Sequence, residues 1–108
     1  MSSNWEFDRT QRDLDGLVLI EARNEAEAIL LLVDRAPGSP VWMQLTGEEH
    51  AAIAAARDRL ASVNLAEDSS AIRAATLTLD HATRRYAELQ MDAAISTAIR
   101  GKIKGRII

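Results

Sequence analysis

The chain has 108 residues, which is enough for a single domain with one modest hydrophobic core. Apolar residues make up 47% of it and are mostly Ala, Leu and Ile, whereas aromatic residues make up only 4%, a composition that suits close-packed helices better than strands. The formal net charge is −3, with −7 in residues 1–99 and +4 in residues 100–108, and an acidic body argues against nucleic-acid binding.

The first predicted helix covers about residues 6–36. Gly16 lies inside it and is either a tolerated weakness or the point where the helix bends or begins, because glycine costs about 1 kcal/mol relative to alanine in a helix. Pro37 and Pro40 in the sequence APGSP end this helix, since proline cannot continue it. The apolar residues fall largely along one helical stripe: Leu14, Leu17, Val18, Ala22, Ile29, Leu32 and Val33.

A short apolar segment and a second helix follow. In the sequence VWMQL, Trp42 and Leu45 are too apolar for a free loop, so we expect the segment to fold back over the core. Thr46 followed three residues later by Glu49 is typical of a capping box, which predicts a helix over about residues 47–63. Its apolar residues recur at spacings of three and four: Ile53, Ala56, Leu60 and Val63.

The third predicted helix covers about residues 70–101, with Ser69 or Ser70 as its N-cap. Its first part has an apolar stripe at helical spacing, but the apolar positions change phase after Leu89. A straight helix would carry the later apolar residues onto a different face. The change of phase therefore predicts a kink, or a short fourth helix, with the break near residues 89–92.

The end of the chain has the sequence GKIKGRII. Gly101 is predicted to close the last helix, and residues 102–108 to form a frayed tail, although their alternating basic and apolar residues also suit contact with an acidic partner or a membrane surface. The chain as a whole is predicted to be a single all-α domain over residues 1–108. Its expected architecture is an antiparallel helical bundle of three long helices, the third kinked or split to give a short fourth.

Residues able to carry chemistry are sparse. The chain has no cysteine, no glycine-rich phosphate loop and no His and Glu at metal-binding spacing, so we expect no catalytic, cofactor-binding or metal site. The two histidines, His50 and His81, are expected at the surface. One enzyme alternative is a small all-helical mutase, which binds an anionic substrate between helices through buried arginines. Arg12, Arg23 and Arg35 are separated by about three helical turns each, which predicts that they share roughly one face.

Two stretches resemble a known family of chaperones. EARNEAEAIL, residues 21–30, resembles a segment in the long lid helix of the seventy-kilodalton heat-shock chaperones. Residues 71–101 are similar to the end of the HscA branch, the DnaK-like chaperones of iron–sulfur cluster assembly, and the resemblance extends from about Asp8 onward. The positions that carry it in residues 71–101 are Ala71, Ile72, Ala74, Ala75, Leu79, Ala82, Thr83, Tyr86, Met91, Asp92, Ile95, Ala98 and Gly101.

The resemblance implies a C-terminal helical lid that covers bound client peptide, without the β-sandwich that holds the peptide. It also implies that the chain has no ATP site, because ATP binds to the separate ATPase domain of a full-length chaperone. Such a chain is either a piece of a longer chaperone or a free-standing relative. The N-terminal half of the first helix would contact the client peptide or the β-sandwich domain, and the partner-contact candidates are Leu14, Leu17, Ile20, Arg23 and Asn24.

A free-standing interaction or oligomerisation module is the alternative. The apolar side chains of LVLI, residues 17–20, would then be buried against a second copy in a homodimer. Asn24 is expected to be exposed, or else to fix the register of a helix seam as polar residues do in coiled coils. The longest nearly apolar run, AILLLV, is far too short to span a membrane. With no secretion signal at the start of the chain, we expect a soluble cytoplasmic protein.

Overall fold

The computed structural model describes the backbone of residues 3–107 and the side chains of residues 9–101. Its described residues form four α-helices and two short 3-10 segments, without any strand. In chain order these are α1 (Ser3–Arg35), η1 (Ala36–Gly38), η2 (Pro40–Gln44), α2 (Gly47–Val63), α3 (Ser69–Ala82) and α4 (Arg84–Ile107). The predicted all-α class is confirmed, and α1 passes through Gly16 without interruption.

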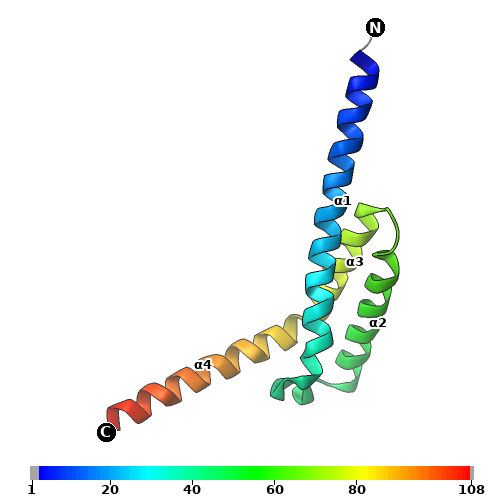
Figure 1. The fold of residues 1–108 in the computed structure, drawn as a ribbon. Coiled ribbons are helices and arrows are strands. Elements are labelled where there is room, and N and C mark those ends of the chain that lie inside the picture. Colours follow the sequence, from blue (N-terminus) through cyan, green and yellow to red (C-terminus); the bar gives the residue numbers. More distant parts are fainter. Residues whose placement is uncertain (1–2, 108) are drawn as a thin grey trace.

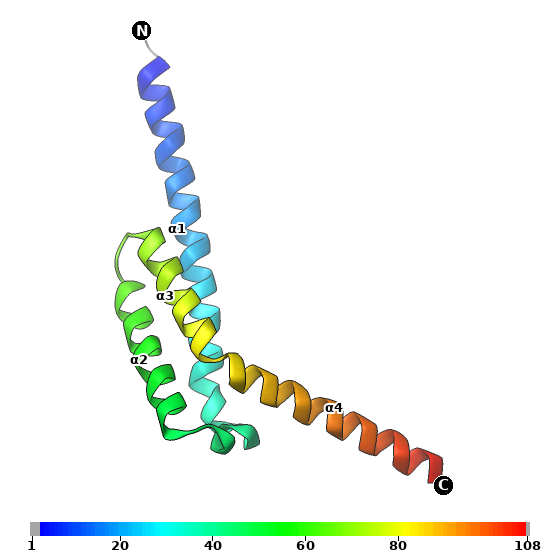
Figure 2. The same cartoon turned by 180° about the vertical axis from the view of Figure 1, so that it is seen from behind.

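The first three helices pack side by side as an antiparallel bundle, while α1 and α4 both extend beyond it (Figures 1 and 2). The first turns of α1 project past the α2–α3 connection, and α4 leaves the opposite end as a separate arm. The radius of gyration over Cα atoms is 20.3 Å, well above the roughly 13 Å expected for a compact domain of this length. The molecule is therefore elongated and bent, with its core in the bundle alone.

The core forms where α1, α2 and α3 meet. From α1 it receives small residues, Ala22 and Ala26, which are almost completely buried and let the neighbouring helices approach closely. The larger side chains come from α2 and α3, as their stripes at spacings of three and four predict. The largest fully buried side chains are Ile53, Leu60, Ile72 and Leu79.

The segment after α1 folds back over the core, as its apolar residues predict. Val41 and Leu45 are buried, and the ring of Trp42 stacks on the ring of His50 with centroids 4.5 Å apart. The Nε2 atom of His50 lies 2.8 Å from the carbonyl oxygen of Trp42. The prediction that His50 lies at the surface is therefore wrong, because η2 covers the start of α2; His81 is exposed, as predicted.

The start of α2 confirms the capping box. The Glu49 backbone N–H donates to the Thr46 hydroxyl at 3.1 Å, and the Thr46 backbone N–H donates to the Glu49 carboxylate at 3.0 Å. The predicted serine cap of α3 is wrong, since Asp68 occupies the N-cap and its carboxylate accepts from the backbone N–H of Ala71 at 3.1 Å. Aspartate there combines the capping hydrogen bond with a favourable interaction with the helix dipole.

The break between the last two helices lies at Thr83, so the prediction of a break near residues 89–92 is wrong. Thr83 is buried, and its hydroxyl donates to the carbonyl oxygen of Asp80 at 3.0 Å, a local bond that competes with straight helix geometry. The phase change after Leu89 has a different origin. It marks the point where α4 leaves the bundle, since its described side chains beyond Gln90 are all exposed.

The fourth helix was predicted to be short, but it is 24 residues long. It continues past Gly101, which has no positive φ, so the prediction that this glycine closes the helix is also wrong. Glycine lowers helix propensity by about 1 kcal/mol but does not by itself end a helix. The side chains of the predicted tail, residues 102–108, lie outside those that the structure describes.

Candidate partner-contact surface on α1

The N-terminal part of α1, which we call the free end (residues 9–20), runs from beyond the bundle to its edge, where Leu19 packs against the core, and presents apolar side chains to solvent. All its described side chains up to Val18 are exposed, and the first buried side chain among those described in α1 is that of Ala22. Three large apolar side chains of the free end are more than half exposed: Leu14 at 51%, Leu17 at 58% and Ile20 at 55%. Neighbouring exposed apolar side chains on one rigid element are typical of a surface that binds a partner.

Asn24 continues this surface toward the bundle. It lies seven residues after Leu17 and four after Ile20, and these intervals return a helical side chain to nearly the same direction. Its side chain is exposed, which agrees with the state expected from the sequence. An amide group on an apolar face offers a hydrogen bond that constrains how a partner aligns with the helix.

Arg23, in contrast, joins α1 to the α2–α3 connection. Its Nη2 atom donates to the carbonyl oxygen of Ala66 at 3.0 Å, and its Nε atom is buried with no hydrogen-bond partner among the described residues. Beside it, Glu21 and Arg73 form an ion pair between α1 and α3 at 3.8 Å. These contacts attach α1 to α3 and to the α2–α3 connection, close to the residues where the free end begins. Partner contact by the five candidate residues stays a prediction.

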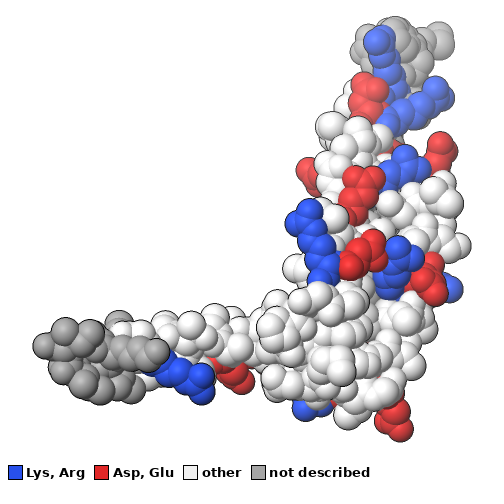
Figure 3. Space-filling view, turned by 60° about the horizontal axis from the view of Figure 1, so that its bottom comes forward, with Lys and Arg blue, Asp and Glu red and all other residues white. Residues whose placement is uncertain are grey.

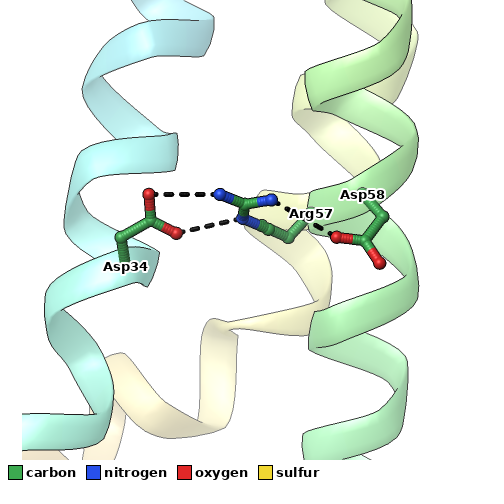
Figure 4. Close-up of polar contacts among 3 residues, drawn as sticks. All are labelled: Asp34, Arg57 and Asp58. Atoms are coloured by element: carbon green, nitrogen blue, oxygen red, sulfur yellow. Dashed lines mark hydrogen bonds and ion pairs between the residues drawn. The ribbon is translucent and has the colours of Figure 1, made fainter.

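A second contact fixes α1 at the other end of the bundle (Figure 4). Arg57 of α2 donates from Nε and Nη2 to the two carboxylate oxygens of Asp34, at 3.0 and 3.3 Å. Its Nη1 atom also donates to Asp58 at 3.3 Å. The hydrogen bonds and charge of Asp34, and then those of Asp58, raise the pKa of Arg57 above its ordinary value. Because α1 is held at both ends of the bundle, its free end is a straight extension of a fixed helix.

The three arginines of the enzyme alternative point to different places. Arg12 is exposed on the free end, Arg23 reaches the α2–α3 connection, and Arg35 lines an open pocket between α1 and α4. The prediction that they share one face is wrong, because the twelve residues from Arg23 to Arg35 turn the helix by about 120° beyond whole turns. They therefore do not surround a common substrate.

Two further properties concern the described residues as a whole. Nowhere among them do three or more His, Asp or Glu side chains gather closely enough to hold a metal ion. None of the helices, within the part searched, has both the length and the apolar character that a membrane span requires. The surface on α1 is therefore the candidate site, and its features are apolar contact area and a fixed helix direction.

Comparison with known proteins gives one consistent result. The chain is 31% identical over 91 residues to a chaperone protein HscA homolog of Tolumonas auensis, a match that covers 84% of the chain and 15% of the relative. It is 33% identical over 96 residues to HscA homologs of Variovorax paradoxus and Haemophilus influenzae, covering 89% of the chain and 15% and 16% of these relatives. No family model matches the chain, and no solved structure matches it.

The chain thus spans about 15% of the length of the curated relatives it matches. The matched region extends over most of this sequence, in agreement with the resemblance that begins near Asp8. Both stretches that carried the resemblance lie in helices of the structure: residues 21–30 in α1, and residues 71–101 in α3 and α4 with the break at Thr83 between them. The chain is accordingly similar to the C-terminal helical lid segment of HscA, the DnaK-like chaperone, as the sequence predicts.

Proposed function

We propose that the chain is a non-catalytic helical lid that covers client peptide bound to the β-sandwich domain of a DnaK-like or HscA-like chaperone. The similarity to HscA supports the chaperone role. The single observation that carries the lid function is the apolar free end of α1, on which Leu14, Leu17 and Ile20 are each more than half exposed. Because α1 is attached at both ends of the bundle, its free end is presented to a partner in one fixed direction.

The lid acts on the rate at which the client leaves. Covering the exposed parts of three such side chains contributes roughly 3 kcal/mol, because full burial of a Leu or Ile contributes roughly 1.5–3 kcal/mol. That free energy corresponds to a change of about two orders of magnitude in a dissociation constant. Differences of this kind between related complexes reside mainly in the dissociation rate. The client is therefore retained longer without any covalent step.

The proposed role needs no ATP, cofactor or metal in this chain. In a full-length chaperone the ATP-dependent steps belong to the separate ATPase domain, and the lid responds to them. Following the resemblance to HscA, we place the protein in the cytoplasm, in client folding or iron–sulfur cluster assembly. Its partners in this role are client peptide and the β-sandwich domain.

A chimera tests the proposal. In an HscA relative, the matched segment is replaced by this complete chain, and the chimera is compared with the same relative truncated before that segment. The measured quantity is the dissociation rate of a fluorescent client peptide after dilution into unlabelled peptide. We expect dissociation to be at least about tenfold slower from the chimera than from the truncated protein. Equal dissociation rates would exclude the lid function.

A further inference from the structure

A second apolar face lies on α4. This helix contacts η2 and α3 near its start, and its described side chains from Met91 to Gly101 are all exposed. One side of this stretch is apolar at helical spacing: Met91, Ala94, Ile95, Ala98 and Ile99. A single helix without tertiary contacts is marginally stable in water. The α4 face therefore gains stability from any partner that covers it.

A surface of matching character lies on the C-terminal half of α1. Ala28, Leu31 and Leu32 line an open pocket in the angle between α1 and α4, and both leucines are about half exposed. On the face shown in Figure 3, the described part of the α4 arm carries few charged side chains compared with the bundle. The two surfaces combine large apolar side chains with alanines, which allow two helices to approach closely.

The two helices carry opposite charge. Eight acidic and four basic residues give α1 a formal charge of −4, whereas six basic and two acidic residues give α4 a charge of +4. Four of the basic residues lie in residues 100–106, and α1 has Glu21 and Glu25 shortly before its C-terminal apolar surface. Packing of α4 on α1 is therefore favoured by charge as well as by apolar contact.

The charges also select the relative direction of the two helices. In an antiparallel arrangement with Ile95 beside Leu31, residues 100–106 lie level with residues 20–26 of α1, because both helices rise equally per residue. These positions include two glutamates and one arginine, Arg23, whose side chain is turned toward the carbonyl oxygen of Ala66 in the α2–α3 connection. In a parallel arrangement, residues 100–106 lie level with residues 36–42, which follow α1 and contain no acidic residue. The antiparallel arrangement is therefore favoured.

The α4 arm is held away from the α1 of its own chain. Thr83 and Tyr86 are buried at its base, where the Tyr86 ring packs edge-on against Trp42 with centroids 5.8 Å apart. Arg85, in the first turn of α4, forms an ion pair with Glu49 of α2. These contacts fix the direction in which α4 leaves the bundle (Figures 1 and 2). The exposed α4 face is thus presented to another molecule.

We propose that two copies of this chain associate by exchanging their α4 helices, so that each α4 packs antiparallel on the C-terminal half of the partner's α1. Ile95 and Ile99 cover the surface that Leu31 and Leu32 present. A twofold axis makes this contact twice, because each copy supplies one α1 surface and one α4 face. Leu14 and Leu17 of the free end lie outside the contact, whereas Ile20 and Asn24 lie level with residues 106 and 102, so the association would cover part of the candidate partner-contact surface.

Sedimentation of the complete chain over a concentration series tests the association. We expect a species of twice the 11.8 kDa chain mass, and Ile95→Glu should weaken its association at least about tenfold. Leu77→Glu is the matched control, since Leu77 is 68% exposed on α3 and should leave the association unchanged. Circular dichroism checks that both variants stay helical. A monomer at every concentration, or a dimer insensitive to Ile95→Glu, would overturn the proposal.

Cysteine cross-linking tests the pairing of the helices. The natural chain has no cysteine, so Ala28→Cys combined with Ala98→Cys places one reactive pair at positions that lie level in the antiparallel arrangement. Oxidation should give a covalent dimer on a non-reducing gel, whereas neither single variant should give the doubly linked product. A cross-linked monomer would show that α4 packs on the α1 of its own chain, which contradicts the exchange.

Discussion

Glu49 links the start of α2 to the base of α4. Its carboxylate accepts the backbone N–H of Thr46 in the capping box and pairs with Arg85 of α4. The hydrogen bond from the Thr46 backbone is the largest influence that lowers the pKa of Glu49, with smaller contributions from the Thr46 side chain and Arg85. Because the pKa is lower in the folded state, the stabilisation is present near neutral pH. It is lost as the pH falls through the folded value.

Glu49→Gln should therefore flatten the decline of stability in acid. The melting temperature of the wild-type chain should fall as the pH drops from neutral through the acidic range in which carboxylates are protonated, and part of this fall should disappear in the variant. Glu48→Gln is the matched control, since the neighbouring Glu48 takes no part in the capping box. Thermal unfolding followed by circular dichroism measures the effect. Identical pH profiles for wild type and Glu49→Gln would contradict the assigned contacts.

Gly16 should be replaceable by alanine with a gain in helix stability. It lies in the free end with a helical backbone, and a Cβ atom there meets no other atom within 4 Å. Gly16→Ala should stabilise the local helix by about 1 kcal/mol, which corresponds to amide exchange about fivefold slower around residues 9–20. Hydrogen–deuterium exchange of the complete chain measures this. Faster exchange in the variant would show that the glycine has a conformational role.

The buried and the exposed face of a helix contribute unequally to the free energy of unfolding, as α3 shows most clearly. Leu79 is fully buried between the helices of the bundle, whereas Leu77 is exposed. Leu79→Ala should lower the free energy of unfolding by roughly 2–5 kcal/mol, and Leu77→Ala should change it by less than about 0.5 kcal/mol. Urea unfolding measures both. Similar losses for the two variants would mean that the bundle is not the core of the molecule.

Local signals in the sequence predicted the elements well. Thr46 and Glu49 predicted the start of α2, because both partners of a capping box lie within four residues, and the apolar spacing predicted the core face of α2. Features that depend on contacts between residues far apart in the sequence were not predicted. His50 is half-buried because η2 folds over it, and the break at Thr83 reflects the packing of Tyr86 on the same segment. Periodicity alone placed the break later, where α4 has already left the bundle.

The candidate site was predictable in part for the same reason. Exposed apolar residues at helical spacing, such as Leu17 and Ile20, are visible in the sequence, although their exposure requires α2 and α3 to cover a different face of α1. Arg23 has the same sequence context but donates to a carbonyl oxygen 43 residues away. No local pattern reveals such a bond, because the acceptor is a backbone atom of Ala66 that any residue would supply.

At the scale of the whole molecule, the bundle serves to hold two projecting helices in fixed directions. One carries the free end, which we assign to a client or β-sandwich partner, and the other carries the α4 face. The molecule measures 79 Å along its longest axis but only 17 Å along its shortest, so its projecting helices are accessible over much of their length. This shape suits the proposed cover over a neighbouring domain, since the proposed client contact lies away from the core.

Hydrogen–deuterium exchange of the HscA chimera, with and without saturating client peptide, tests the lid most directly. An unsupported helix opens often, so the backbone amides of residues 9–20 should exchange quickly in the absence of client. When client is bound, we predict that exchange in residues 9–20 slows at least about tenfold, while exchange in residues 91–99 stays the same. Exchange in residues 9–20 that does not respond to saturating client would contradict the proposal that the free end of α1 covers the bound peptide.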